Sequence, residues 1–302
     1  MGHGKLKKFA ENETFRCLLQ PDASAVLAKT PGSRELRLNE HPIKGNWGRE
    51  VFGNDHAIVL ELGCGKGDYT IALALRHPEI NYIGVDIKGA RLWKGAKYAT
   101  EQALPNVAFL RTRIEFIEAF FGPGEVSEIW LTFSDPQLRG SENARLSSPL
   151  FLERYRKFLR LGGIVHLKTD SRYLYEYTQA VCKVNDLQVL ACGTDIYGEG
   201  IHVPEPSLRD PSHPDGWAPP SYTAEGGHGF GDMHPLALDM VTQVQTFYEK
   251  MFLEIGLPIT YMAFRIDHEG PYAFPGEAFD HDYWLAAEGP RRSFSHQPAK
   301  KQ

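Results

Sequence analysis

The most constraining feature of this 302-residue chain is an apolar run that ends in a glycine-rich turn. Residues 58–62 read Ile-Val-Leu-Glu-Leu, and a second apolar run, 82–86, ends in Asp86. Between them stand three glycines at alternate positions, Gly63, Gly65 and Gly67. Such glycines tolerate positive φ and let a ligand approach the backbone, while the acidic residue accepts hydrogen bonds from ribose hydroxyls. The pattern predicts a strand, turn, helix and strand that bind a nucleotide-type cofactor.

The glycine spacing separates the candidate cofactors. A dinucleotide fingerprint has its third glycine three residues after the second, whereas Asp68 occupies that place here. A phosphate-binding P-loop is excluded because no Ser or Thr follows a Gly-Lys pair. Carboxylates at Glu61 and Asp68 favour a cationic ligand that carries an adenosine, which is S-adenosylmethionine. A dinucleotide enzyme and a purely structural turn remain as alternatives to a methyltransferase.

Apolar runs and amphipathic segments alternate from residue 58 onward. The sequence predicts strands at 58–62, 82–86, 107–111, 126–133, 163–168 and 187–193. Helices are predicted at 68–76, 88–103, 114–120, 148–160, 171–185 and 236–254, before a last strand at 259–266. Repeated βα crossovers indicate a doubly wound, Rossmann-like α/β sheet, mostly parallel with an antiparallel last strand that pairs with 187–193.

The regular alternation covers only part of the chain. We expect an N-terminal arm at 1–50, a methyltransferase domain at 51–266 with a Pro/Gly-rich insertion at 198–235, and a C-terminal tail at 267–302. A hydrophobic content of 42% over 302 residues suits one elaborated domain. Aromatic residues in the tail predict that part of it packs onto the core.

Composition and residue spacing indicate the cellular compartment of the protein and argue against some kinds of site. No run of about 18 apolar residues is present and the first residues are polar and basic, so we expect a cytoplasmic protein without a membrane partner. The four cysteines show no C-x-x-C pairing, and the twelve histidines show no metal-binding spacing. The sequence therefore predicts neither a disulfide framework nor a metal site.

Charge is uneven along a chain whose net charge is −5. Basic residues outnumber acidic ones in the first third, and acidic residues outnumber basic ones in the last third. A helix at 88–103 would carry Lys88, Arg91 and Lys94 on roughly one side. Such a face is often only solvated, but it could also join other basic residues in a stripe that contacts phosphates. The other members of this stripe are Lys5, Lys7, Lys8, Arg139, Arg145 and Arg172.

Polar residues follow four of the predicted strands. Ligands of an open α/β sheet bind beyond the carboxyl ends of its strands, so these residues are expected to converge on one crevice. Pro136 forces Asp135 into an extended conformation that aims its side chain at the crevice, for recognition of the substrate or of the methionine moiety. The alternative for Asp135 is a helix cap or a salt bridge. Asp170 stands where a helix N-cap belongs, so capping and binding remain equally open for it.

Several separated motifs resemble the bacterial tRNA (guanine-N7-)-methyltransferases, which use S-adenosylmethionine to modify a guanosine in the variable loop. The similarity spans most of residues 4–266. It rests on Lys5–Glu13, Glu61–Gly67, Gly84–Arg91, Phe133–Pro136, Phe151–Leu152, Leu167–Asp170 and Thr246–Glu249.

The resemblance implies a role for each matching residue. Asp135 takes the catalytic position and also contacts the cofactor. The remaining cofactor contacts are Glu61, Gly63, Cys64, Gly65, Gly67, Asp86, Ile87, Arg113 and Ile114. Arg113 replaces the Asp or Asn that the family usually offers to the adenine, so main-chain groups are expected to hold the adenine there. The tRNA guanosine is implied to contact Arg139, Asp170, Thr246, Tyr248 and Glu249.

The chain departs from the family pattern after Asp135-Pro136. Family members usually continue with Trp-Pro and a dense Lys/Arg run, whereas only Arg139 and Arg145 are basic here. Each lost phosphate contact weakens binding of a nucleic acid. Two alternatives therefore stay open: an S-adenosylmethionine-dependent methyltransferase with a different substrate, such as a small molecule, and a non-catalytic RNA-binding paralogue.

Overall fold

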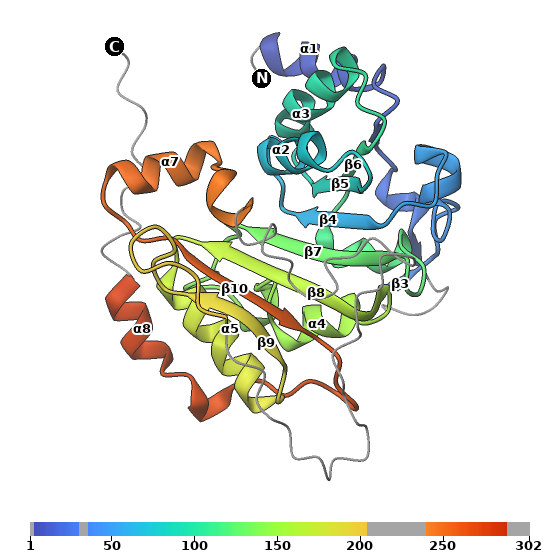
Figure 1. Ribbon diagram of the computed structural model, residues 1–302. Coiled ribbons are helices and arrows are strands. Elements are labelled where there is room, and N and C mark those ends of the chain that lie inside the picture. Colours follow the sequence, from blue (N-terminus) through green and yellow to red (C-terminus); the bar gives the residue numbers. More distant parts are fainter. Residues whose placement is uncertain (1–2, 30–35, 204–239, 289–302) are drawn as a thin grey trace.

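The computed structural model describes residues 3–29, 36–203 and 240–288. These residues form an eight-stranded sheet with the order β1-β6-β5-β4-β7-β8-β10-β9 (Figure 1). The strands are β1 (Leu18–Leu19), β4 (Ile58–Leu62), β5 (Asn81–Asp86), β6 (Val107–Arg111), β7 (Val126–Thr132), β8 (Leu159–Thr169), β9 (Val189–Gly193) and β10 (Thr260–Arg265). A small separate sheet pairs β2 (Leu27–Lys29) with β3 (Leu36–Leu38).

The sheet is parallel from β1 through β8 and changes direction at one end. β10 runs antiparallel to both of its neighbours, β8 and β9. The predicted fold class, a mostly parallel α/β sheet with an antiparallel last strand, is confirmed.

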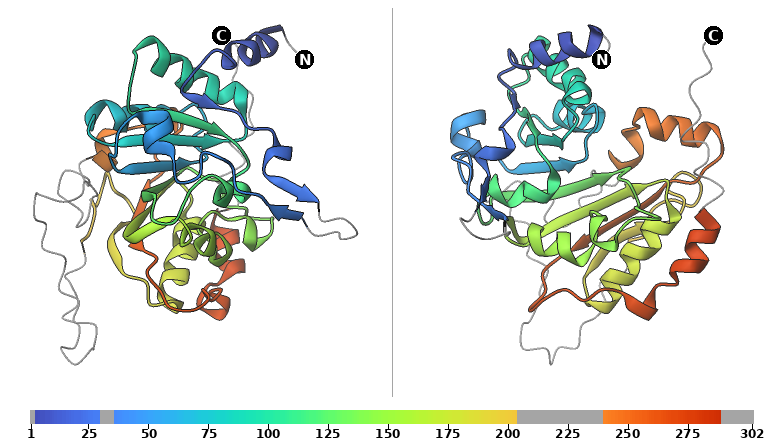
Figure 2. Two further views of the ribbon diagram at one scale, coloured as in Figure 1. Left: turned by 90° about the vertical axis from the view of Figure 1, so that its right-hand side faces the viewer. Right: turned by 180° about the vertical axis from the view of Figure 1, so that it is seen from behind.

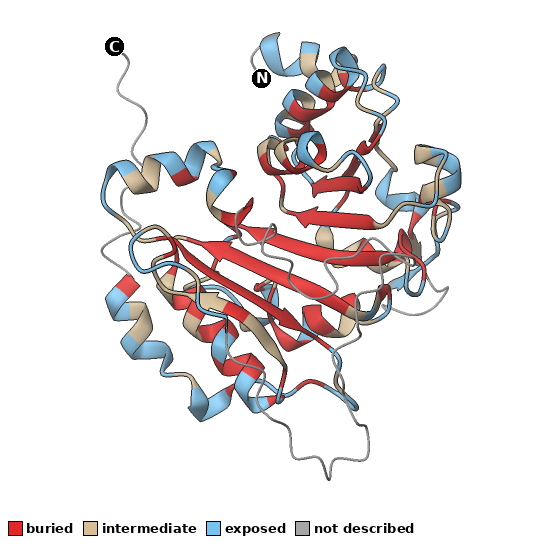
Figure 3. Ribbon diagram, viewed as in Figure 1, coloured by how far each residue is buried: buried red, intermediate tan, exposed pale blue. Residues whose placement is uncertain are grey.

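Helices cover both faces of the sheet (Figure 2). One face packs against α2 (Asp68–Arg76) and α3 (Gly89–Glu101), and the other against α4 (Pro149–Tyr155) and α5 (Arg172–Val184). Neighbouring residues of β4 point to opposite faces, so Val59 packs in the core on the side of α2 and α3, and Leu60 packs in the core on the side of α4 and α5. All five residues of β4 are buried, as a central parallel strand requires (Figure 3).

The segment predicted as an N-terminal arm contains helices and strands that contact the rest of the fold. Helix α1 (His3–Asn12) lies against α3, where Asn12 Nδ2 donates to the carbonyl of Gly89 over 3.0 Å. Glu11 accepts a hydrogen bond of 2.6 Å from Trp93 Nε1. β1 extends the main sheet by pairing with β6. The first residues are therefore attached to the helix that begins beside the glycine turn.

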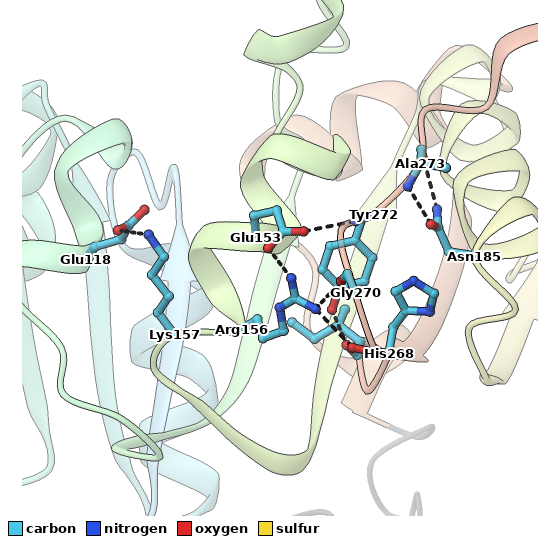
Figure 4. A network of polar contacts seen from close by, with 10 residues as sticks. Glu118, Glu153, Arg156, Lys157, Asn185, His268, Gly270, Tyr272 and Ala273 are labelled. Carbon is cyan, nitrogen blue, oxygen red and sulfur yellow. Dashed lines mark hydrogen bonds and ion pairs between the residues drawn. The ribbon is translucent and has the colours of Figure 1, made fainter.

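The chain after β10 returns along α4 and α5 (Figure 4). Arg156 Nη1 donates to the carbonyls of His268, over 2.9 Å, and Gly270, over 2.6 Å. Asn185 and Ala273 exchange two hydrogen bonds, of 2.9 and 2.7 Å. A last described helix, α8 (His281–Glu288), then lies against α5.

Two predicted helices were wrong in their bounds, and the strand predicted at 163–168 begins earlier than expected. The helix predicted at 148–160 ends at Tyr155, and β8 already begins at Leu159. The helix predicted at 236–254 is interrupted at 244–246, and its described part after the break is α7 (Phe247–Glu254). The break has a local cause, because Thr246 caps a new helix N-terminus. Residues 204–235 of the predicted insertion lie outside the described residues.

No helix in the described ranges is both long and apolar enough to cross a membrane.

Candidate active-site cleft

A cleft of about 820 Å³ opens beyond the carboxyl ends of the parallel strands. Its walls come from the turn after β4, the ends of β5 and β6, the loop after β7, the end of β8, and α7. It collects eight of the predicted site residues: Gly63, Asp86, Ile87, Arg113, Ile114, Asp135, Asp170 and Tyr248. Convergence of these separate strand ends is what the parallel topology predicts.

The glycine turn presents bare backbone at the cleft through Gly63, while Gly65 and Gly67 do not line it. Gly63, Gly65 and Gly67 have φ values of 81, 58 and 74°. A Cβ added at Gly63 or Gly65 would meet no atom within 4 Å, whereas one at Gly67 would lie 2.6 Å from the ring of Phe109. The first two glycines leave space for a ligand, and the third allows close packing of α2 on the sheet. Cys64 is buried between them, and burial raises the pKa of its thiol.

Asp86 both shapes the turn and faces the cleft. Its Oδ2 accepts a hydrogen bond of 3.0 Å from Gly65 N, and its Oδ1 accepts one of 2.7 Å from Lys88 N. An ionised carboxylate offers about four lone-pair sites, so two backbone bonds leave acceptor capacity for ribose hydroxyls.

Glu61 lies beneath the turn and is 4% exposed. Its Oε2 accepts from the backbone N–H of Thr70, over 2.8 Å, and from the hydroxyl of the same residue. Its Oε1 accepts from the hydroxyl of Thr132 over 2.5 Å. Burial raises the pKa of Glu61 to about 7, against the effect of these bonds. Glu61 does not line the cleft; its contacts join β4, α2 and the end of β7.

The loop after β7 carries Asp135 into the cleft on a strained backbone. Phe133 and Gln137 both have φ of 51°, a conformation that residues other than glycine rarely adopt. Asp135 is exposed at the cleft, and its Oδ1 accepts a hydrogen bond of 2.9 Å from Gln137 N. Strain of this kind is kept where the surrounding structure enforces it, which makes the loop a candidate for function.

Ser134 is a cleft residue that the sequence did not single out as a site residue. Its side chain is buried, and among the described residues its hydroxyl has no hydrogen-bond partner. An unsatisfied buried hydroxyl is costly, so a bound group could supply the missing partner.

Helix α7 forms the opposite wall through one apolar face. The cleft is lined there by Tyr248, Met251, Phe252 and Ile255. This i, i+3, i+4, i+7 spacing is legible in the sequence and would have indicated the whole face rather than Tyr248 alone.

Thr246 and Glu249 support that wall from within. They form a capping box, and Thr246 Oγ1 accepts from Glu249 N over 3.1 Å. Glu249 Oε1 lies 2.6 Å from Lys168 Nζ, and both side chains are fully buried. Lys168 also donates to the carbonyls of Val241 and Val244, over 2.5 and 2.9 Å. Neither Thr246 nor Glu249 is among the residues that line the cleft.

The predicted phosphate-contacting stripe needs one correction. Arg145 is 3% exposed and bonds to the backbone of the Asp135 loop, so it cannot reach a phosphate. Arg139 is exposed but does not line the cleft.

Asp170 does line the cleft, as its position after a predicted strand indicated. The N-cap of α5 is Ser171, whose hydroxyl accepts from Leu174 N, so capping is not the role of Asp170.

The residues present suit S-adenosylmethionine. The cleft volume falls within the range of about 300–1,000 Å³ that is usual for small-molecule sites. Open space at Gly63, an acidic side chain at the end of β5 and an unpartnered hydroxyl at Ser134 offer a ligand surface, a ribose acceptor and a further hydrogen bond.

Comparison with known proteins gives consistent matches. Residues 55–195 match the protein family described as "Putative methyltransferase". A Bacteroides thetaiotaomicron protein named tRNA (guanine-N(7)-)-methyltransferase is 39% identical over 97% of this chain and 98% of its own length. Proteins of the same name from Christiangramia forsetii and Porphyromonas gingivalis are 42% and 40% identical, over 87% and 83% of this chain and 97% and 89% of their own lengths.

Proposed function

This chain belongs to the tRNA (guanine-N(7)-)-methyltransferase family, and on that premise we propose that it methylates N7 of a guanosine in the variable loop of tRNA. Its methyl donor is S-adenosylmethionine. The observation that carries the proposal is the convergence of Asp86, Asp135 and Asp170 on one cleft, in a chain similar to a named relative over nearly its full length. Because tRNA is the substrate, we place the protein in the cytoplasm.

Each wall of the cleft has its own part in the reaction. Gly63, Gly65 and Asp86 hold the cofactor, with Ile87 and the backbone at Arg113 and Ile114 beside its adenosine. Glu61, Cys64 and Gly67 keep the turn in shape beneath it. When bound, S-adenosylmethionine supplies an electrophilic methyl group.

Guanine N7 has an in-plane lone pair and carries no proton. The protein therefore needs no general base to create the nucleophile, and its main contribution is to position the base. Asp135 and Asp170 accept hydrogen bonds from the donor edge of guanine, and Asp135 also offsets the positive charge that the purine gains. Tyr248 contacts the guanosine from α7, while Thr246 and Glu249 act by holding that helix.

The phosphates of tRNA would contact basic side chains of α1 and α3. Lys5 and Lys7 are exposed on α1, which packs on α3, and Lys88 and Arg91 line the cleft itself. This surface would compensate for the missing basic run after Asp135. In that segment Arg139 is the one basic side chain that is exposed, since Arg145 is buried. Binding through these residues predicts an affinity that falls steeply with salt.

The test is a transfer assay with defined RNA. Purified protein is incubated with labelled S-adenosylmethionine and unmodified total tRNA, and the labelled nucleotide is mapped. We expect 7-methylguanosine in the variable loop. A tRNA transcript with adenosine at that guanosine position is the matched control, and it should accept no label.

Two negative results would point in different directions. Cofactor binding without transfer to tRNA would contradict the proposed substrate and favour a methyltransferase for another molecule. Failure to bind S-adenosylmethionine, with retained tRNA binding, would instead favour an RNA-binding paralogue.

A further inference from the structure

Arg145 is a buried cation attached to the loop that carries Asp135. Its Nε donates to the carbonyl of Pro136 over 3.1 Å, and its Nη2 donates to the carbonyl of Gln137 over 3.4 Å. Its guanidinium lies 5.1 Å from the ring centre of Tyr173 and 4.5 Å from that of Tyr177. Burying a charge is costly without compensating contacts, so this site is built to hold a guanidinium in one orientation.

The contact with Pro136 acts on Asp135 through a single peptide group. The carbonyl of Pro136 and the N–H of Gln137 belong to the same planar unit, and that N–H donates to Asp135 Oδ1 over 2.9 Å. Rotation of this unit would break both hydrogen bonds at once. Since Gln137 is already held at φ 51°, the loop needs an external contact to keep this conformation.

The same guanidinium is joined to the C-terminal helix. Arg145 Nη2 donates to the hydroxyl of Tyr173 over 2.6 Å, and that oxygen lies 2.6 Å from Nδ1 of His281 in α8. A second contact ties the two helices, because Tyr173 N donates to Glu288 Oε2 over 3.2 Å. A chain of hydrogen bonds thus runs from α8 to the loop that carries Asp135.

We propose that Arg145 is a positioning residue for Asp135, and that His281 of α8 fixes Arg145 through Tyr173. Neither side chain touches the substrate; each acts by holding the peptide group that orients the Asp135 carboxylate. The inference deepens the proposed function, because it concerns the rate of methyl transfer to tRNA once both ligands are bound.

The test compares kcat and KM for tRNA in variants of this chain of contacts. Arg145→Gln should lower kcat about 100-fold, since a small displacement of a positioned group carries a penalty of that size. Tyr173→Phe and His281→Ala each remove one hydrogen-bonding group and should lower kcat about threefold to tenfold. His281→Asn, which keeps a polar atom near the position of Nδ1, should restore most of the rate lost in His281→Ala.

Several measurements separate positioning from a general loss of structure. Turnover is divided by the number of sites that bind S-adenosylmethionine, so unfolded molecules do not count. Arg145→Ala should recover activity in millimolar guanidinium chloride, because a free guanidinium ion can occupy the space beside Tyr173 and Tyr177 that the side chain leaves. It should not recover activity in sodium chloride. Tyr175→Phe, the same change in the same helix at a hydroxyl not bonded to Arg145, should leave kcat unchanged.

The outcomes distinguish this inference from the proposed function. Absence of transfer by the unsubstituted protein would contradict the function itself. Transfer by the unsubstituted protein, with an unchanged kcat per cofactor site in Arg145→Gln, would overturn the role of Arg145. If Arg145→Gln does not fold, unchanged rates in both Tyr173→Phe and His281→Ala would overturn the proposed chain of contacts.

Discussion

The turn wall of the cleft, residues 61–67 and 86–87, is held mainly by groups close in sequence, whereas the helix wall, residues 133–137 and 246–255, also depends on several distant ones. In the turn wall, Glu61 bonds to Thr70 and Asp86 bonds to Gly65. The bond from Thr132 to Glu61, by contrast, joins residues far apart in the chain. In the helix wall, Lys168 reaches a carbonyl 73 residues away, and Tyr173 reaches a histidine 108 residues away. Local sequence therefore specifies most of the turn wall, and buried polar contacts across the fold specify most of the helix wall.

The largest expected effect comes from the ion pair that anchors the helix wall. Lys168→Met should lower the free energy of unfolding by about 3–5 kcal/mol, because it leaves the Glu249 carboxylate buried without its cation. Burial already lowers the pKa of Lys168 to about 8, although Glu249 opposes that shift. Urea denaturation followed by circular dichroism measures the change.

A double variant tests the cause. Lys168→Met combined with Glu249→Leu removes both charges and should recover much of the lost stability. At urea concentrations below the unfolding midpoint, the affinity for S-adenosylmethionine should change little in either variant if the turn wall is independent of the helix wall. A large loss of S-adenosylmethionine affinity would show that the two walls are coupled, and would break the comparison.

The turn wall has a buried titratable group of its own, the carboxyl of Glu61. Its pKa is raised from 4.5 to about 7, so the folded state favours the protonated form. This stabilising contribution is fully present below pH 4.5 and is lost as pH rises through 7, by up to about 3 kcal/mol. Glu61→Gln mimics the protonated form, so its stability relative to the unsubstituted protein should increase over that pH range.

Denaturation curves at several pH values give the result. Glu277→Gln, which removes an exposed carboxylate elsewhere, is the matched control and should follow the unsubstituted protein. A pH-independent difference for Glu61→Gln would mean that the carboxyl titrates alike in the folded and unfolded states.

A substitution of Asp135 tests the helix wall without disturbing the backbone. Asp135→Asn keeps an oxygen that can accept from Gln137 N and removes the charge, so the loop should persist. We expect kcat to fall about 100-fold, or about 2.7 kcal/mol, with cofactor affinity largely retained. Single-turnover methylation of tRNA measures this step.

Asp195→Asn is its matched control. Asp195 Oδ1 accepts from Gly198 N over 3.0 Å in a similar turn after β9, and Asp195 does not line the cleft. Equal rates for Asp135→Asn and the unsubstituted protein would exclude a charge-based role for Asp135.

The sequence predicted most of the turn wall for a physical reason. Apolar strands, glycines that must adopt positive φ and an acidic residue after the next strand are local signals, and Gly63 and Asp86 were found where the pattern put them. The parallel sheet with its antiparallel last strand followed from the same alternation of strands and helices.

The helix wall was less predictable because its contacts join residues far apart in the chain. The break before α7 depends on the cap at Thr246, and the burial of Arg145 depends on tyrosines of α5. A basic residue near the loop that carries Asp135 predicts a phosphate contact unless those partners are known. The apolar face of α7 did have a periodic signal, but the uninterrupted helix expected at 236–254 obscured where that face begins.

The smallest expected effect separates two roles for Thr246. The family resemblance implies that Thr246 holds the guanosine, whereas its hydroxyl accepts from Glu249 N at the start of α7. If capping is its role, Thr246→Ala should cost about 1 kcal/mol of stability and raise KM for tRNA, while Thr246→Ser and Thr246→Asp should retain activity because both residues cap helices well. If Thr246 contacts the guanosine directly, Thr246→Asp should lose activity despite a stable α7. We therefore compare kcat/KM with the melting temperature across these three variants. The comparison decides whether Thr246 contacts the guanosine itself or only stabilises the helix whose apolar face lines the cleft.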